Sequence, residues 1–169
     1  MKEIIKKKVL ITGALGQDGI IISKILKKQN YSVIGLIKKN DKVKIQGVKY
    51  FVNNLKNSHK LKYLIKKISP NYLIHFASVN NSFHNPKNND YKKLYLDNIL
   101  ISKNIINLII ENNKNTKIVF IGSSQMFSLP KKNIIDEKTK FKSSHYYGKY
   151  KIFIHNYLMK LKKKYKLNA

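Results

Sequence analysis

The 169-residue sequence contains no cysteine, no tryptophan and no arginine, and only eight acidic residues. Without cysteine, disulfides, thiolate zinc ligands and thiol catalysis are excluded. No apolar run approaches the roughly 18 residues of a membrane-spanning helix, and the basic segment 1–8 is not followed by a signal-peptide core. A hydrophobic fraction of 43% is sufficient for one folded domain. We therefore expect a single soluble domain in the cytoplasm.

The positive charge is carried by lysine alone. All 35 basic residues are lysines, and the formal net charge is +27. Such a charge is typical of proteins that bind nucleic acids or anionic membranes, but arginine, the usual bidentate ligand of phosphate and guanine, is missing. Lys, Asn and Ile make up 80 of the 169 residues, and all three have codons that contain only A and T. We interpret the lysines as an effect of AT-rich coding and expect no nucleic-acid or membrane partner.

Short apolar runs alternate with helical patterns along the whole chain. Strands are predicted for residues 8–12, 32–37, 48–52, 72–77 and 117–122. Helices are predicted for residues 20–26, 61–68, 91–111 and 147–164. Polar or irregular loops are expected at 85–93 and 129–144. This alternation is typical of βαβ units, so the predicted fold class is α/β, with a doubly wound parallel sheet that is covered on both faces.

Three glycines directly follow the first predicted strand. Gly13, Gly16 and Gly19 allow a tight turn, a close approach of the backbone to a pyrophosphate, and close packing of helix on strand. The helix that begins here offers free N–H groups and the positive end of its dipole to phosphates. The segment therefore predicts a dinucleotide site.

The segment ITGALGQDG, residues 11–19, resembles the opening of the extended short-chain dehydrogenase/reductase superfamily, which modifies nucleotide sugars. Gln17 and Asp18 make it most similar to the GDP-mannose 4,6-dehydratases. The resemblance implies a Rossmann-type nicotinamide-nucleotide domain over residues 1–169. Members of that family are about twice as long and form homo-oligomers. We expect an N-terminal portion whose sheet stops before a sixth strand, with the substrate domain absent and the edge of the last strand unpaired.

The second predicted strand ends in Lys38 and Lys39, where NAD-binding folds usually carry an acidic residue. Two cations suit a 2′-phosphate, so NADP is predicted in preference to NAD. The dehydratases, which use NADP, have two arginines at the matching positions. The segment Asn54-Leu55-Lys56-Asn57 resembles their Asp-Leu-x-Asp motif near the adenine. The resemblance thus implies cofactor contacts from Gly13, Gly16, Gln17, Asp18, Gly19, Lys38, Lys39, Asn54, Leu55, Ala77, Tyr147 and Lys151.

Tyr147 and Lys151 are four residues apart, which places them on one face of a helix. An ammonium group beside a phenol favours its ionised form and lets tyrosine act as a base near neutral pH. Ser123 follows a predicted strand and matches the catalytic Ser/Thr of the family. Asn98 matches the family's supporting asparagine. The resemblance implies a catalytic set of Ser123, Tyr147 and Lys151, with no metal.

The implied reaction is the conversion of GDP-mannose to its 4-keto-6-deoxy product. Tyr147 would take the proton of the C4 hydroxyl while a hydride passes to NADP. Gln125 stands where the family has the glutamate that removes the C5 proton, and a carboxamide cannot accept that proton. Elimination is therefore expected to be impaired while C4 oxidation survives. We expect the isolated chain to bind NADP weakly and not to turn over GDP-mannose.

Three alternatives remain open at this point. Another nucleotide-sugar epimerase or reductase needs only Ser123, Tyr147 and Lys151 for redox chemistry at C4. The chain could also be a non-catalytic NADP-binding module, or a basic nucleic-acid binder. His75, in the predicted strand 72–77, is interpreted as a packed residue of the strand rather than a catalytic one.

Overall fold

The computed structural model describes residues 6–39, 45–79, 90–127 and 134–167. All strands in this part of the chain run parallel in one sheet, in the order β3-β2-β1-β4-β5. The strands are β1 (Lys8–Thr12), β2 (Ser32–Ile37), β3 (Lys49–Val52), β4 (Tyr72–His75) and β5 (Lys117–Phe120). Chain order reverses between β1 and β4, and parallel α/β sheets bind ligands at such a crevice.

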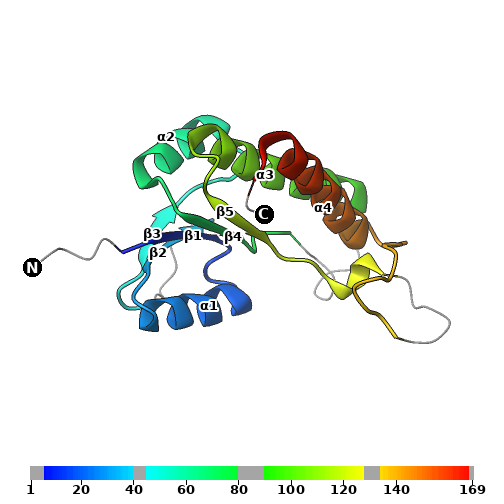
Figure 1. Ribbon diagram of the computed structural model, residues 1–169, viewed down its shortest axis with the longest axis horizontal. Coiled ribbons are helices and arrows are strands. Elements are labelled where there is room, and N and C mark those ends of the chain that lie inside the picture. Colours follow the sequence, from blue (N-terminus) through cyan, green and yellow to red (C-terminus); the bar gives the residue numbers. More distant parts are fainter. Residues whose placement is uncertain (1–5, 40–44, 80–89, 128–133, 168–169) are drawn as a thin grey trace, which may run out of the picture.

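Helices cover both faces of the sheet, as Figure 1 shows. One face carries α1 (Gln17–Lys28), and the other carries α2 (Ser58–Ile68), α3 (Tyr91–Asn112) and α4 (Tyr146–Tyr165). A short 3₁₀ turn, η2 (Ser124–Met126), follows β5 and contacts α4. The predicted doubly wound α/β fold is confirmed.

The two faces of β1 show how the sequence creates these layers. Successive side chains of a strand point to opposite faces. Leu10 belongs to the larger core, which packs against α2, α3 and α4, whereas Val9 and Ile11 belong to the smaller core beside α1. All three side chains are buried. The continuous apolar run in β1 is thus the signature of a strand that is covered on both sides.

The predicted element boundaries are correct to within three residues, and two differences are informative. The first helix begins at Gln17 rather than at 20, because Gly16 is its N-cap. The strand predicted for 72–77 ends at His75, since the N–H of Ala77 donates to the side chain of Thr12. Residues 85–89 and 129–133 of the predicted loops lie outside the described residues.

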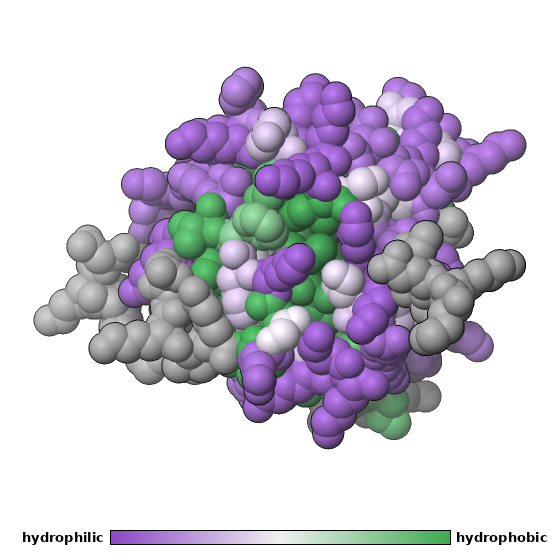
Figure 2. Space-filling view, turned by 90° about the vertical axis from the view of Figure 1, so that its left-hand side faces the viewer, coloured by the Kyte–Doolittle hydropathy of each residue, from purple (hydrophilic) through white to green (hydrophobic). Residues whose placement is uncertain are grey.

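Among the described strands, β3 and β5 form the two edges of the sheet. Val119 of β5 is 45% exposed, on the face of the sheet where α1 is the helix among the described residues. Hydrophilic side chains dominate the face shown in Figure 2 and surround a hydrophobic area at its centre. In the part of the chain described here, no helix is long and apolar enough to cross a membrane.

Candidate nucleotide and active site

The turn after β1 is shaped by its glycines. Gly13 has a φ of 69°, and a Cβ there would lie 2.9 Å from the backbone nitrogen of Ala77. A Cβ on Gly19 would lie 2.8 Å from Cα of Ala14. Both positions therefore require glycine, the first for conformation as well as space. The turn delivers the chain directly into the amino-terminal end of α1, where N–H groups favour an anion.

A cavity of about 430 Å³ lies beside this turn, at the carboxyl ends of the strands. It brings together predicted cofactor residues that are far apart in the sequence: Gly13, Gly16, Lys38, Lys39, Asn54, Leu55 and Ala77. The other predicted residues of the turn, Gln17, Asp18 and Gly19, lie in the first turn of α1 and are not part of the cavity lining. Both lysines are exposed at the cavity rim.

The asparagines of the loop after β3 have different roles: some hydrogen-bond the backbone, and some line the cavity. Asn54 Oδ1 accepts from the backbone N–H of Lys56 at 3.0 Å, and Asn57 caps α2. Asn53 also lines the cavity, and its Oδ1 is buried without a hydrogen-bond partner within the described structure. Buried acceptors are nearly always satisfied, so Asn53 is a ligand-binding candidate that the motif comparison missed.

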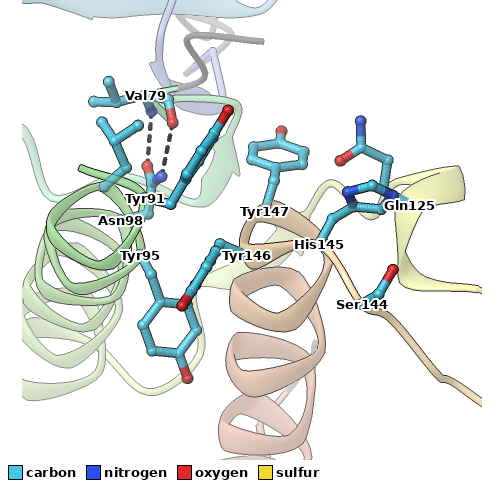
Figure 3. Close-up of a pocket in the computed structure, with 10 residues that line it drawn as sticks. Val79, Tyr91, Tyr95, Asn98, Gln125, Ser144, His145, Tyr146 and Tyr147 are labelled. Carbon is cyan, nitrogen blue, oxygen red and sulfur yellow. Dashed lines mark hydrogen bonds between the residues drawn. The ribbon is translucent and has the colours of Figure 1, made fainter. Parts of the chain in front are cut away.

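A second cavity, of about 500 Å³, lies between α3 and the start of α4. Figure 3 shows its aromatic and polar lining, which includes Tyr91, Tyr95, Gln125, His145, Tyr146 and Tyr147. Val79 lines both cavities. The 430 Å³ cavity beside the glycine turn, called the nucleotide cavity below because it contains the predicted cofactor residues, therefore adjoins the cavity that contains Tyr147.

Asn98 holds the segment that separates the two cavities. Its amide group accepts from the N–H of Val79 at 2.7 Å and donates to the carbonyl of Val79 at 2.8 Å, as drawn in Figure 3. The side chain of Asn98 is buried in α3. This helix asparagine thus fixes the backbone after β4 with two hydrogen bonds.

Tyr147 and Lys151 share one face of α4, as their spacing predicted. The Nζ atom of Lys151 lies 5.4 Å from the centre of the Tyr147 ring and donates to the carbonyl of Ile121 at 2.7 Å. Burial lowers the pKa of Lys151 from 10.5 to about 8. The lysine is therefore charged at neutral pH but releases its proton more easily than an exposed lysine does.

The hydroxyl of Tyr147 makes its hydrogen bond with Ser78 Oγ, at 3.3 Å. Ser78 lines the nucleotide cavity. Ser123, the predicted catalytic serine, lies after β5 at the start of η2, where its Oγ accepts from the N–H of Gln125 at 3.2 Å. Ser78 follows a strand just as Ser123 does, but the motif comparison singled out only Ser123.

No group of three or more metal-ligating side chains occurs among residues 6–39, 45–79, 90–127 and 134–167. The chemistry that the two cavities offer consists of anion binding at the turn, lysine charge, and hydroxyl groups of serine and tyrosine. Such groups can bind a phosphorylated ligand and move a proton.

The family model for "NAD dependent epimerase/dehydratase family" matches residues 9–169. The chain therefore belongs to the NAD-dependent epimerase/dehydratase family. It is 28% identical over 156 residues to the UDP-glucose 4-epimerase of Mycoplasma genitalium, a match that covers 85% of this chain and 44% of that protein. The chain thus spans about half the length of the relatives it matches.

Solved structures confirm the fold. UDP-glucose 4-epimerase from Brucella ovis, solved in complex with NAD, superposes with a TM-score of 0.84 at 19% identity and covers 95% of this chain and 49% of that one. L-threonine dehydrogenase from Clostridium difficile gives a TM-score of 0.83 at 20% identity, covering 97% and 51%. Since enzymes of different chemistry match equally well, the likeness defines the fold and leaves the substrate open.

Two sequence-based expectations are modified by these comparisons. Membership of the family is confirmed, but the Mycoplasma genitalium relative is a 4-epimerase, so the epimerase alternative has better support than the GDP-mannose dehydratase reading. Structures solved with NAD are among the matches, so the preference for NADP stays a prediction from Lys38 and Lys39.

Proposed function

We propose that this chain binds a nicotinamide dinucleotide in the 430 Å³ cavity and forms the nucleotide-binding part of a nucleotide-sugar epimerase that acts at the sugar C4. The observation that carries the proposal is the junction of the two cavities. Ser78, in the nucleotide cavity, hydrogen-bonds the hydroxyl of Tyr147, and Val79 lines both spaces. A dinucleotide that lies along the first cavity would thus bring its reactive end toward Tyr147.

Each part of the cavity suits one part of a dinucleotide. The turn at Gly13 and Gly16 and the amino-terminal end of α1 would hold the pyrophosphate. The unpartnered oxygen of Asn53 could accept from the amino group of adenine. The ammonium groups of Lys38 and Lys39 would face a ribose 2′-phosphate, as in NADP. When bound, the nicotinamide supplies a site that accepts a hydride from the sugar and returns it.

Tyr147 would act as the base that removes the proton of the sugar hydroxyl, and as the acid that returns it. The ammonium group of Lys151, fixed by the carbonyl of Ile121, favours negative charge on the phenol oxygen. Gln125 lines the second cavity and carries no carboxylate to remove a proton from carbon. Oxidation and re-reduction at C4 need no such base, which favours an epimerase over a 4,6-dehydratase.

Magnetisation transfer from the bound dinucleotide tests the proposal. Nuclear Overhauser effects are measured between the nicotinamide protons and the aromatic protons of tyrosine. The Tyr147→Phe variant assigns the signal of Tyr147. The matched control is Tyr63→Phe, on the exposed surface of α2. We expect contacts to Tyr147. A nicotinamide that binds but contacts residues away from Tyr147, or a dinucleotide that does not bind, would contradict the proposal.

A further inference from the structure

A chain of buried hydrogen bonds runs across the molecule from the nucleotide turn to α4. Thr12 Oγ1 lies 2.6 Å from Nδ1 of His75, and Nε2 of His75 lies 2.9 Å from Ser102 Oγ. Ser102 Oγ in turn lies 3.3 Å from the hydroxyl of Tyr150. Each of these four side chains is at most 1% exposed. They come from β1, β4, α3 and α4, so this series of hydrogen bonds joins four separate elements.

The partners of Thr12 favour one direction for the hydrogen bonds. Its Oγ1 accepts from the N–H of Ala77 at 3.2 Å, and donation of its hydroxyl proton to Nδ1 of His75 gives this buried proton an acceptor among the described residues, which the reverse direction does not. A neutral imidazole has one donor and one acceptor. In this arrangement, His75 carries its proton on Nε2 and donates it to Ser102 Oγ. Burial and the nearby charge of Lys151 lower the pKa of His75 to about 3, which keeps the ring neutral.

The two residues at the ends of this series of hydrogen bonds, Thr12 and Tyr150, lie at the two halves of the proposed site. Thr12 immediately precedes Gly13 of the turn, and Tyr150 immediately precedes Lys151. The rings of His75 and Tyr150 also both pack against Phe120. His75 is stacked on that ring and Tyr150 meets it edge to face, with ring centres 6.0 and 6.2 Å away. Apolar packing alone tolerates sliding of one element on another, whereas buried hydrogen bonds are directional and costly to break.

We propose that His75 is a positioning residue: through Thr12 and Ser102, its ring fixes the register of α4 against the nucleotide turn. The significance of this register for catalysis rests on the proposed roles of Tyr147 and Lys151. The ring does not reach the substrate and moves no proton in the reaction. It acts by holding the helix that carries the reactive pair.

Selective labelling with [¹⁵N]glycine provides a test that needs no ligand. The chain has only seven glycines, among them Gly13 at the turn and Gly148 in α4. Thr12→Val removes one hydroxyl with little change of shape. We expect it to shift the amide resonance of Gly148 several-fold more than Thr116→Val, a control that removes another buried hydroxyl, bonded to the carbonyl of Pro70. In a Ser102→Ala background, Thr12→Val should lose its effect on Gly148.

The Gly148 resonance can also contradict the proposal. It is overturned if Thr12→Val leaves Gly148 at the level of the Thr116→Val control, or if the shift persists undiminished with Ser102→Ala. If Ser102→Ala does not fold, Tyr150→Phe interrupts the same path by removing only a hydroxyl. These spectra are recorded without nucleotide, so a failure of dinucleotide binding would contradict the proposed function and leave this result intact.

The unsubstituted protein offers a second, independent measurement. The ¹⁵N chemical shifts of the His75 ring should show a proton on Nε2 and no titration near pH 6.5. A proton on Nδ1, or ordinary titration of the ring, would overturn the proposed direction of the hydrogen bonds from Thr12 through His75 to Ser102.

Discussion

The hydroxyl of Tyr147 lies 3.3 Å from Oγ of Ser78. Ser78 follows β4, whereas Ser123, the predicted catalytic serine, follows β5. Ser78 belongs to the lining of the nucleotide cavity, whereas Tyr147 belongs to the second cavity. The contact therefore connects the space for a dinucleotide with the side chain proposed as acid and base. Four predictions follow from this arrangement and its surroundings.

The lysine pair after β2 should determine the choice of dinucleotide. Replacing both Lys38 and Lys39 with alanine is expected to weaken NADP binding by roughly tenfold, and to leave NAD binding nearly unchanged, because only NADP has a 2′-phosphate to bind. Calorimetric titration measures both affinities. The matched control replaces Lys66 and Lys67, an adjacent exposed pair on α2. Equal losses for the two dinucleotides would contradict this assignment.

Two glycines of the turn should respond differently to alanine. At Gly19 an added methyl group meets the backbone of Ala14, so we expect Gly19→Ala to lower the free energy of unfolding by about 1–3 kcal/mol. A Cβ added at Gly16 would lie 3.3 Å from its nearest neighbour, the carbonyl oxygen of Gly13, and the backbone there is extended. We therefore expect Gly16→Ala to fold normally but to weaken dinucleotide binding. Urea unfolding and calorimetry separate the effects. A fully stable Gly19→Ala variant would refute the packing argument.

Lys151 should make the fold more stable as the pH rises above 8. The folded state releases the lysine proton at about pH 8, whereas the unfolded chain holds it up to about 10.5. Unfolding in this window takes up a proton, so the free energy of unfolding rises with pH, by at most about 1.4 kcal/mol per pH unit. Urea titrations from pH 8 to 9.5 should show this slope reduced in Lys151→Met. Lys149→Met, an exposed control, should keep it. Identical slopes would show that burial does not perturb Lys151.

Within the described residues no strand pairs with the outer edge of β5, and this edge should promote association of the protein with itself. Unpaired strand edges with apolar side chains template further pairing. We expect Val119→Lys to reduce self-association at high protein concentration without changing dinucleotide affinity, since Val119 lies outside the cavity lining. Sedimentation velocity measures the change. Tyr63→Lys on the exposed surface of α2, away from both sheet edges, is the control, and an equal effect there would point to charge rather than to the β5 edge.

Much of the fold was predictable because local patterns agree with it. Residues 8–12 are predicted as a strand because their central residues, 9–11, are apolar on both faces, and β1 has those bounds. The glycines at 13, 16 and 19 predicted the turn because their spacing has a direct steric reason. The spacing of Tyr147 and Lys151 predicted a shared helix face, which the structure confirms.

The contacts between distant segments were not predictable in the same way. Ser78 reaches Tyr147 across 69 positions of sequence, and His75 reaches Thr12 across 63. No local periodicity records such pairs, since they depend on which strands become neighbours. His75 was interpreted as a packed residue of the strand, and it is indeed buried, but only the structure reveals its hydrogen-bonded partners on both ring nitrogens.

The most direct test of the central claim is a crystal structure of the chain grown with a nicotinamide dinucleotide. We expect the pyrophosphate at the amino-terminal end of α1, against Gly13 and Gly16, and the nicotinamide beside Tyr147. A dinucleotide found elsewhere on the molecule, or one whose nicotinamide points away from α4, would contradict the account.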